Sequence, residues 1–168
     1  MENIIPLLNS YITELQEISK SNKFEKLKTL DIVISKSKRL QDELESLKIR
    51  GYIIYLVTTS EKISLEELIE EKKRSKVFHY SFPQVNEKHF IEGNKYLYIG
   101  SSKEISSRLK QHLGFIGSDK TFSLRLNNWA KGRKIKIDLY ETDTKDNMQL
   151  FEDLLWKEHK PMLGRMGR

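Results

Sequence analysis

The run Tyr52–Thr58 (YIIYLVT) constrains the fold more than any other part of the sequence. Its seven successive β-branched, aromatic or aliphatic residues predict a buried strand. Two more strands are expected at Lys95–Ile99, which Gly100 ends, and at Lys134–Tyr140, where polar and apolar residues alternate. Helices are expected at 64–73, 102–113, 121–130 and 146–159. This order predicts a small α/β (α+β) unit, a three-stranded mixed or antiparallel sheet flanked by helices.

The first 50 residues form a separate predicted unit, an N-terminal helical hairpin. One apolar stripe has helical spacing through Ile4, Leu8, Tyr11, Leu15 and Ile18, and a second runs from Leu27 to Leu47. The interpretation we favour is that both helices cover a core. The alternative is an arm for dimerisation or for clamping DNA.

Composition excludes several classes of protein. The 168 residues suffice for one domain with an appendage. No run of about 18 apolar residues is present, so no transmembrane helix is expected. The segment MENIIPLLNS does not resemble a secretory signal, and we expect a cytoplasmic location. The absence of Cys excludes a thiol nucleophile and a Cys-based zinc site.

The net charge of +6 lies entirely in residues 94–168, which carry 15 basic and 9 acidic residues. Between Lys103 and Lys136 the balance is 9 basic to 2 acidic. A field of this sign favours a polyanion such as nucleic acid. On charge alone, a solvated basic face is an equal alternative.

Chemistry-bearing residues gather where the strand ending in Tyr98-Ile99-Gly100 passes into a helix. The glycine permits a sharp turn and close approach of a ligand, and the helix N-terminus favours an anion. Arg108 and His112 are four residues apart and therefore share one helix face. Such a set would suit a phosphodiester.

The spacing of these residues resembles that of the GIY-YIG nuclease family over about residues 51–168. Tyr55 ends the tripeptide Ile53–Tyr55, Arg108 follows Tyr98 by ten residues, and His112 follows by four more. Glu152 precedes Pro161 by nine residues, as the metal-binding Glu of the family does.

Four features depart from the family pattern or narrow it. Ile53 stands where the family usually has Gly, and about 60–95 is a predicted insertion. The Asn that often follows the Lys-Pro pair is missing. The ending Pro161–Arg165 has the form Pro-x-x-Gly-Arg and resembles a bacterial subgroup in which some members are related to restriction endonucleases.

The resemblance implies a metal-dependent DNA endonuclease that uses Mg²⁺ (or Mn²⁺). It implies that Glu152 holds the metal, that Arg108 holds phosphate oxygens, and that Tyr98 is the base or orients the attacking water. Tyr55 would support Tyr98, and His112 would relay a proton or grip a phosphate. Without the resemblance, Tyr55 in an apolar strand is more typical of a core residue.

DNA-backbone contacts are predicted at seven residues: Gly100, Lys103, Lys110, Lys131, Arg133, Lys134 and Lys136. A role in restriction or anti-phage defence and a homodimer through the N-terminal helices are further hypotheses. The alternative function is an inactive nucleic-acid-binding module that keeps the fold.

Overall fold

A four-stranded antiparallel sheet organises the computed structural model, which describes residues 24–117 and 121–166. The strand order is β1-β4-β2-β3, and every neighbouring pair is antiparallel. The strands are β1 (Phe24–Val33), β2 (Tyr52–Thr58), β3 (Tyr96–Ser102) and β4 (Lys134–Thr142).

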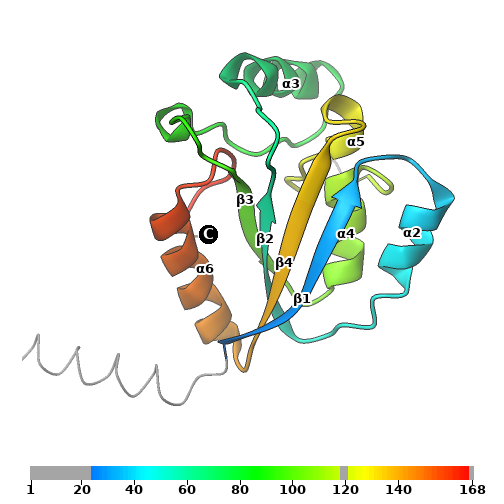
Figure 1. Ribbon diagram of the computed structural model, residues 1–168, viewed down its shortest axis with the longest axis vertical. Helices are drawn as coiled ribbons and strands as arrows, with labels where there is room; N and C mark the ends of the chain where they lie inside the picture. Colours follow the sequence, from blue (N-terminus) through cyan, green and yellow to red (C-terminus); the bar gives the residue numbers. More distant parts are fainter. Residues whose placement is uncertain (1–23, 118–120, 167–168) are drawn as a thin grey trace, which may run out of the picture.

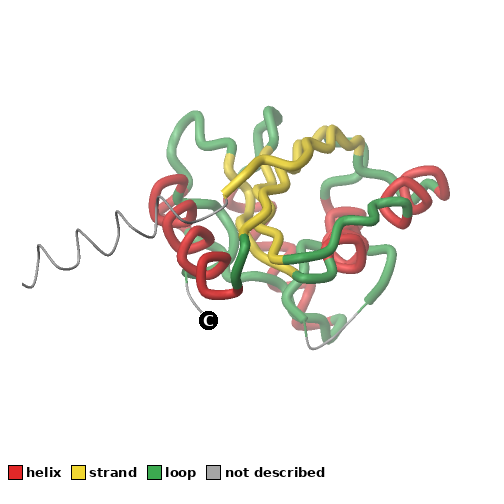
Figure 2. The backbone as a smooth tube through the Cα atoms, turned by 90° about the horizontal axis from the view of Figure 1, so that it is seen from below, coloured by secondary structure: helices red, strands yellow, loops and turns green. Residues whose placement is uncertain are grey.

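Helices lie on both faces of this sheet (Figures 1 and 2). They are α2 (Lys38–Glu45), α3 (Leu65–Val77), α4 (Ile105–Leu113), α5 (Leu126–Trp129) and α6 (Lys145–His159), with a short 3₁₀ turn η1 at Glu87–His89. Helix α6 covers one face, α2 and α4 cover the other, and α3 lies beyond one end of the sheet (Figure 1).

Strand β2 is central, and its alternate side chains enter two different cores. Ile53, Tyr55 and Val57 face the larger core, which contains α2 and α4 residues. Ile54 and Leu56 face the smaller core under α6. Removing a large apolar side chain from water contributes about 1.5–3 kcal/mol. The predicted buried strand is therefore confirmed, and its burial on both faces explains the unbroken apolar run.

The predicted second helix of the N-terminal hairpin is wrong over its first part. Residues Phe24–Val33 form β1, paired with β4, and only Lys38–Glu45 is helical. The sheet therefore has four strands instead of three. Leu30, Ile32 and Ile34 point inward with a period of two, a pattern hidden because Leu27 and Val33 also fit helical spacing. The first predicted helix lies within residues 1–23, outside the described residues.

The helix expected at 121–130 shrinks to Leu126–Trp129. Residues just before it cannot be helical, because their backbone groups bind side chains of α4. The carbonyl of Phe122 accepts from Arg108, and the N–H of Leu124 donates to His112. The other predicted strands and helices are present with shifted ends.

The predicted insertion contains α3, which several contacts hold in place. A capping box begins the helix: Ser64 Oγ accepts from the Glu67 N–H, and Glu67 accepts from the Ser64 N–H. Glu67 also forms an ion pair with Arg133 at 2.6 Å. In the middle of the helix, buried Glu71 accepts a hydrogen bond from Tyr80.

Within residues 24–117 and 121–166, no helix combines the length and the apolar character that crossing a membrane requires.

Asp138 links β4 to β1 and gives the fold a predictable pH dependence. Its carboxylate accepts from Thr29 Oγ1 at 2.6 Å and pairs with Lys26 at 2.7 Å. Burial alone would raise the pKa of Asp138, but these hydrogen bonds and the Lys26 charge outweigh it and lower the pKa. A carboxyl with a lowered folded pKa stabilises the fold above about pH 4, and this contribution is lost as the pH falls below it.

We expect Asp138→Asn to lower the free energy of unfolding by about 1 kcal/mol at neutral pH, because the charge-assisted hydrogen bonds are weakened. The difference from wild type should shrink as the pH falls below about 4. Urea unfolding at neutral and acidic pH measures both effects. Asp31→Asn, which removes an exposed carboxylate of β1, is the control. An Asp138→Asn deficit that stays constant with pH would contradict the assignment.

Candidate active site

Tyr55 and Gly100 lie opposite each other in the β2–β3 pair. A Cβ atom added to Gly100 would lie 2.5 Å from Tyr55 Oη and 2.7 Å from Cε1 of Tyr98. The two tyrosine rings therefore occupy the space that any side chain at this position would need. Gly100 is required here because it lets these two rings share one side of the sheet.

The hydroxyl oxygen of Tyr55 joins β2 to helix α4. It lies 3.1 Å from Nε of Arg108 and 2.8 Å from Nε2 of His112. The Leu124 N–H donates to Nδ1 of His112 at 3.1 Å, so the ring proton of neutral His112 must be on Nε2. Tyr55 therefore accepts two hydrogen bonds, and its own O–H proton remains to be donated.

Burial fixes the protonation state of Tyr55. Its side chain is fully buried, which raises the pKa of Tyr55 far above that of free tyrosine. Nearby Tyr98 and Glu152 raise it as well, and the positive Arg108 only partly offsets them. Tyr55 is thus a neutral hydrogen-bonding group and is unsuited to accept a proton.

The guanidinium of Arg108 is held from three directions. In addition to its bond to Tyr55, it donates through Nη1 to Gln111 at 2.9 Å and through Nη2 to the Phe122 carbonyl at 2.7 Å. Burial would lower the pKa of Arg108, but interactions with Tyr55 and Tyr98 raise it, so the group stays charged. Arg108 also donates a side-chain hydrogen bond to Tyr98, so one of its five N–H groups remains for another acceptor.

The ring of Tyr98 lies between two glycines and reaches a cleft. A Cβ added to Gly164 would come within 3.1 Å of this ring, and Gly164 has a φ of 98°, which disfavours other residues. The ring centroid of Tyr98 is 5.0 Å from that of His112 and 6.0 Å from that of Tyr55. Tyr98 is therefore the aromatic group that connects the buried cluster to the cleft.

Glu152 reaches the same cleft from helix α6, on the other face of the sheet. It is half-buried, and one carboxylate oxygen accepts a hydrogen bond from Ser101 Oγ at 2.5 Å. Ser101 follows Gly100 directly in β3. The edge strand β3 thus positions Tyr98 from one face and Glu152 from the other.

The cleft has a volume of about 910 Å³. Besides Tyr98 and Glu152, its lining includes α3, the loop 83–87, residues 121–122, and Gly164 and Arg165. The predicted catalytic residues are thereby brought together: Tyr55, Arg108 and His112 form a buried cluster, with Tyr98 and Glu152 at the cleft.

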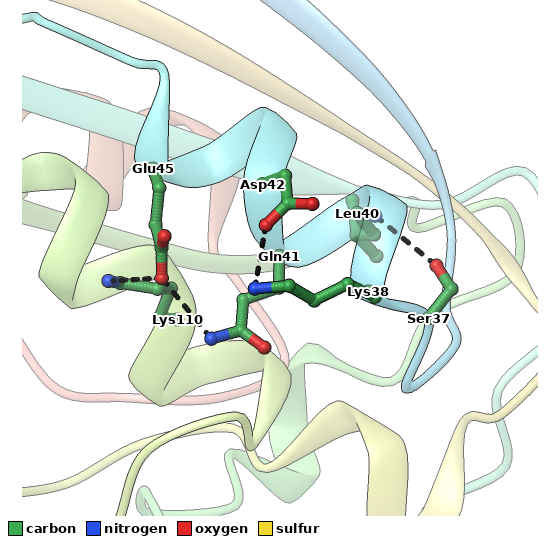
Figure 3. A network of polar contacts seen from close by, with 7 residues as sticks. All are labelled: Ser37, Lys38, Leu40, Gln41, Asp42, Glu45 and Lys110. Atoms are coloured by element: carbon green, nitrogen blue, oxygen red, sulfur yellow. Dashed lines mark hydrogen bonds and ion pairs between the residues drawn. The ribbon is translucent and has the colours of Figure 1, made fainter.

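The positively charged residues predicted to contact DNA are placed differently. Lys110 pairs with Glu45 of α2 at 3.4 Å, in the network shown in Figure 3. Arg133 pairs with Glu67, and Lys136 lies 4.0 Å from Asp138. None of the seven residues in this prediction lines the 910 Å³ cleft, although Gly100 lies behind Tyr98.

The remaining lysines of this group lie elsewhere on the surface. Lys134 and Lys136 line a second depression of about 730 Å³, which shares no residue with the first. The Nζ of Lys103 lies 4.8 Å from the ring centroid of Tyr52, and Lys131 is exposed. Contacts of these residues with DNA stay predictions.

Several residues of the site carried no sequence signal that singled them out. Ser101 and Gln111 act on Glu152 and Arg108, as described above. Asn86, in the insertion, donates through Nδ2 to the carbonyls of Pro161 at 3.0 Å and Gly164 at 2.9 Å. It therefore holds the segment that contacts Tyr98. An isolated Asn in a loop has no pattern that would reveal such a role.

Comparison with protein families identifies the segment that carries this arrangement. Residues 89–165 match the GIY-YIG catalytic domain. The resemblance inferred from the motif spacing is thereby confirmed for this segment, and because the GIY-YIG catalytic domain is a nuclease domain, the match implies a nuclease. No curated protein and no solved structure matches the chain.

The donor set at the cleft fits a hard divalent cation. Glu152 offers a carboxylate at the cleft surface, oriented by Ser101. Mg²⁺ prefers oxygen ligands, keeps several waters, and is commonly held by one or two carboxylates together with substrate phosphates. The described residues contain no group of three or more His, Asp or Glu placed to share a metal ion. Glu152 is therefore the residue that would hold such an ion beside the substrate.

We expect Gly100→Ala to lower the free energy of unfolding by about 1–3 kcal/mol, because the new methyl group overlaps Tyr55 and Tyr98. Urea unfolding measures the loss, and near-ultraviolet circular dichroism should report displaced tyrosine rings. Gly117→Ala is the control, since the nearest contact of its methyl group would be the end of the long Arg125 side chain, at 3.3 Å. Equal stability of Gly100→Ala and wild type would show that the rings are not confined as described.

Proposed function

We propose that this protein is a metal-dependent endonuclease that hydrolyses phosphodiester bonds of DNA. One observation supports the proposal above all others: Tyr98 and Glu152 line one cleft, and the cationic Arg108 is fixed directly behind Tyr98 by its bonds to Tyr55 and Phe122. The match of residues 89–165 to a nuclease domain supports the same conclusion.

Arg108 supplies the positive charge for the reaction. A phosphodiester transition state gathers negative charge on its oxygens, and preorganised donors stabilise that charge without moving. The remaining N–H of Arg108 can donate to a phosphate oxygen, because the hydrogen bonds to Tyr55, Gln111, Phe122 and Tyr98 fix the orientation of the guanidinium.

Tyr98 is the group that orients or deprotonates the attacking water. It lines the cleft, whereas Tyr55 and His112 are buried and bonded to each other. His112 has both ring nitrogens engaged, so we assign it to positioning Tyr55, in place of the proton relay or phosphate grip that the resemblance implies. Tyr55 in turn positions Arg108.

Glu152 would hold the metal ion, Mg²⁺ or Mn²⁺. When bound, the ion supplies Lewis-acid stabilisation of charge on the phosphate oxygens. Ser101 keeps the carboxylate turned to the edge of β3.

The biological setting stays a prediction. Restriction or anti-phage defence and a cytoplasmic location fit a small nuclease. The hypothesis of a homodimer through the N-terminal helices loses support at its second helix, because residues Phe24–Val33 form β1 and Leu40 and Leu44 of α2 are buried in the larger core. Its first helix lies outside the described residues.

The direct test is incubation of supercoiled plasmid with the purified protein and Mg²⁺, beside Glu152→Gln and Arg108→Ala. We expect wild type to give nicked or linear product, and each variant to lose at least about 100-fold in rate. Chelation of the metal should abolish cutting by wild type.

No cutting by wild type, with DNA still shifted in a low-salt gel, would favour the alternative of an inactive nucleic-acid-binding module. Equal cutting by wild type and Glu152→Gln would contradict the role of Glu152.

Ser101→Ala tests whether the orientation of Glu152 matters. Loss of an outer hydrogen bond to a metal ligand typically costs 10- to 100-fold in metal affinity or activity. We therefore expect the Mg²⁺ concentration for half-maximal cutting to rise by about tenfold. Ser102→Ala is the matched control, since the Ser102 hydroxyl bonds to the backbone N–H of Glu104 and not to Glu152. A Mg²⁺ response identical to that of wild type would exclude this role.

A further inference from the structure

Helix α3, in the insertion, brings lysines to the cleft that holds Tyr98 and Glu152. The α3 residues that line this cleft are Ile69, Lys72, Lys73 and Lys76. Their spacing of three, four and seven residues places them on one face of the helix. Arg165 lines the same cleft from the segment after α6. The three polar residues of α3 that line the cleft, Lys72, Lys73 and Lys76, are therefore all cationic.

The acidic residues of α3 do not neutralise this face. Glu67 is paired with Arg133, and Glu71 is buried against Tyr80. Glu66 and Glu70 do not line the cleft. The acids of the helix, which all precede its lysines in the sequence, are thus not placed at the cleft with them.

The three lysines have different roles. Lys72 donates to the carbonyl of Phe82 at 2.5 Å and holds the loop that follows α3. Lys73 and Lys76 are exposed, and neither forms an ion pair among the described residues. Burial, together with the nearby charge of Lys76, lowers the pKa of Lys72. The lysines on this face of α3 therefore already repel each other, and a bound anion would reduce that repulsion.

Helix α3 is held rigidly relative to Tyr98 and Glu152. The ion pair between Glu67 and Arg133 fixes the start of α3, the bond between Tyr80 and Glu71 fixes its second half, and Leu68 is fully buried. Figure 1 shows α3 beyond the end of the sheet. Acidic groups at the cleft are Glu152, the metal-binding candidate, and Glu87.

We propose that Lys73 and Lys76 of α3, together with Arg165, bind the phosphate backbone of the DNA strand that occupies the cleft beside Tyr98 and Glu152. The occupant that fits is a polyanion with regularly spaced charges, since a cationic helix face adjoins a site suited to one phosphodiester. Such contacts position the strand and do not read bases. This inference rests on the proposed function and extends it to the insertion.

The test compares Lys73→Ala/Lys76→Ala with wild type in binding a fluorescein-labelled duplex without divalent metal, by anisotropy across a salt series. Loss of two phosphate contacts should lower the magnitude of the slope of log K against log salt by about 1.8. At roughly 100 mM salt the affinity should fall on the order of 10- to 60-fold. Lys73→Arg/Lys76→Arg should retain most of the affinity, because the charge is kept.

Lys36→Ala/Lys48→Ala is the matched control. Both residues are exposed, neither lines the cleft, and the change in net charge is the same. We expect it to bind nearly as wild type does. With Mg²⁺ and enzyme at a concentration below the dissociation constant, Lys73→Ala/Lys76→Ala should cut more slowly by about the same factor as it binds more weakly, whereas Glu152→Gln should bind but not cut.

The possible outcomes separate this inference from the proposed function. If wild type cuts DNA and Lys73→Ala/Lys76→Ala binds with the affinity and salt slope of the Lys36→Ala/Lys48→Ala control, the inference is overturned while the function stands. If wild type binds but never cuts, the function fails, and the same affinity comparison still decides the inference. If wild type does not bind the duplex at all, the inference is overturned.

Discussion

The hydroxyl oxygen of Tyr55 is the point on which the site depends. It accepts hydrogen bonds from Arg108 and His112 of α4, and it belongs to the central strand β2. A buried oxygen that satisfies two buried donors is costly to remove, because each donor would otherwise lose its partner. This contact fixes the position of α4 against the sheet, and the backbone at 122–124 is then held by the same two side chains.

The edge position of β3 explains how residues from both faces of the sheet reach one cleft. Tyr98 extends from the face that α4 covers, and Glu152 comes from α6 on the opposite face. An edge strand has an unpaired side that a substrate or another segment can approach. The segment after α6 uses part of it, since the N–H groups of Met162 and Leu163 donate to the carbonyls of Tyr96 and Leu97.

Local patterns predicted the strand–helix unit from Tyr98 to His112, because the strand and the helical spacing lie within fifteen residues of sequence. The predicted turn at Gly100 is wrong, because this residue lies inside β3 and makes room for the tyrosine rings. The place of Tyr55 could be inferred only by resemblance, since about forty residues separate it from Tyr98 and the pairing with Gly100 is a long-range contact. The family match begins at residue 89 and does not include β2. Strand β2, outside the matched segment, therefore supplies Tyr55 to the site through its pairing with β3.

The charge pattern of the sequence predicted the residues at the cleft least well, for a physical reason. A count along the chain placed the excess of positive charge at 103–136, but Lys110 and Arg133 are engaged in ion pairs. The stretch around α3 appeared neutral because its acids and bases cancel in a linear count. Only the fold shows that Glu67 and Glu71 are used elsewhere and that lysines face the cleft. Similarly, β1 was hidden because Leu27, Leu30 and Val33 fit helical spacing, although only Leu30 of the three packs against the core.

The order of the cleft residues along the chain has a consequence for synthesis. Tyr55 and α3 are made early, whereas Glu152, Gly164 and Arg165 follow only after α6 has formed. At 5–20 residues per second, roughly 5–20 s separate Tyr55 from Arg165 during translation. Throughout that interval the emerging chain carries Tyr98 and Arg108 without the carboxylate that would hold a metal. A nascent chain is therefore unable to assemble this cleft until synthesis has passed residue 165.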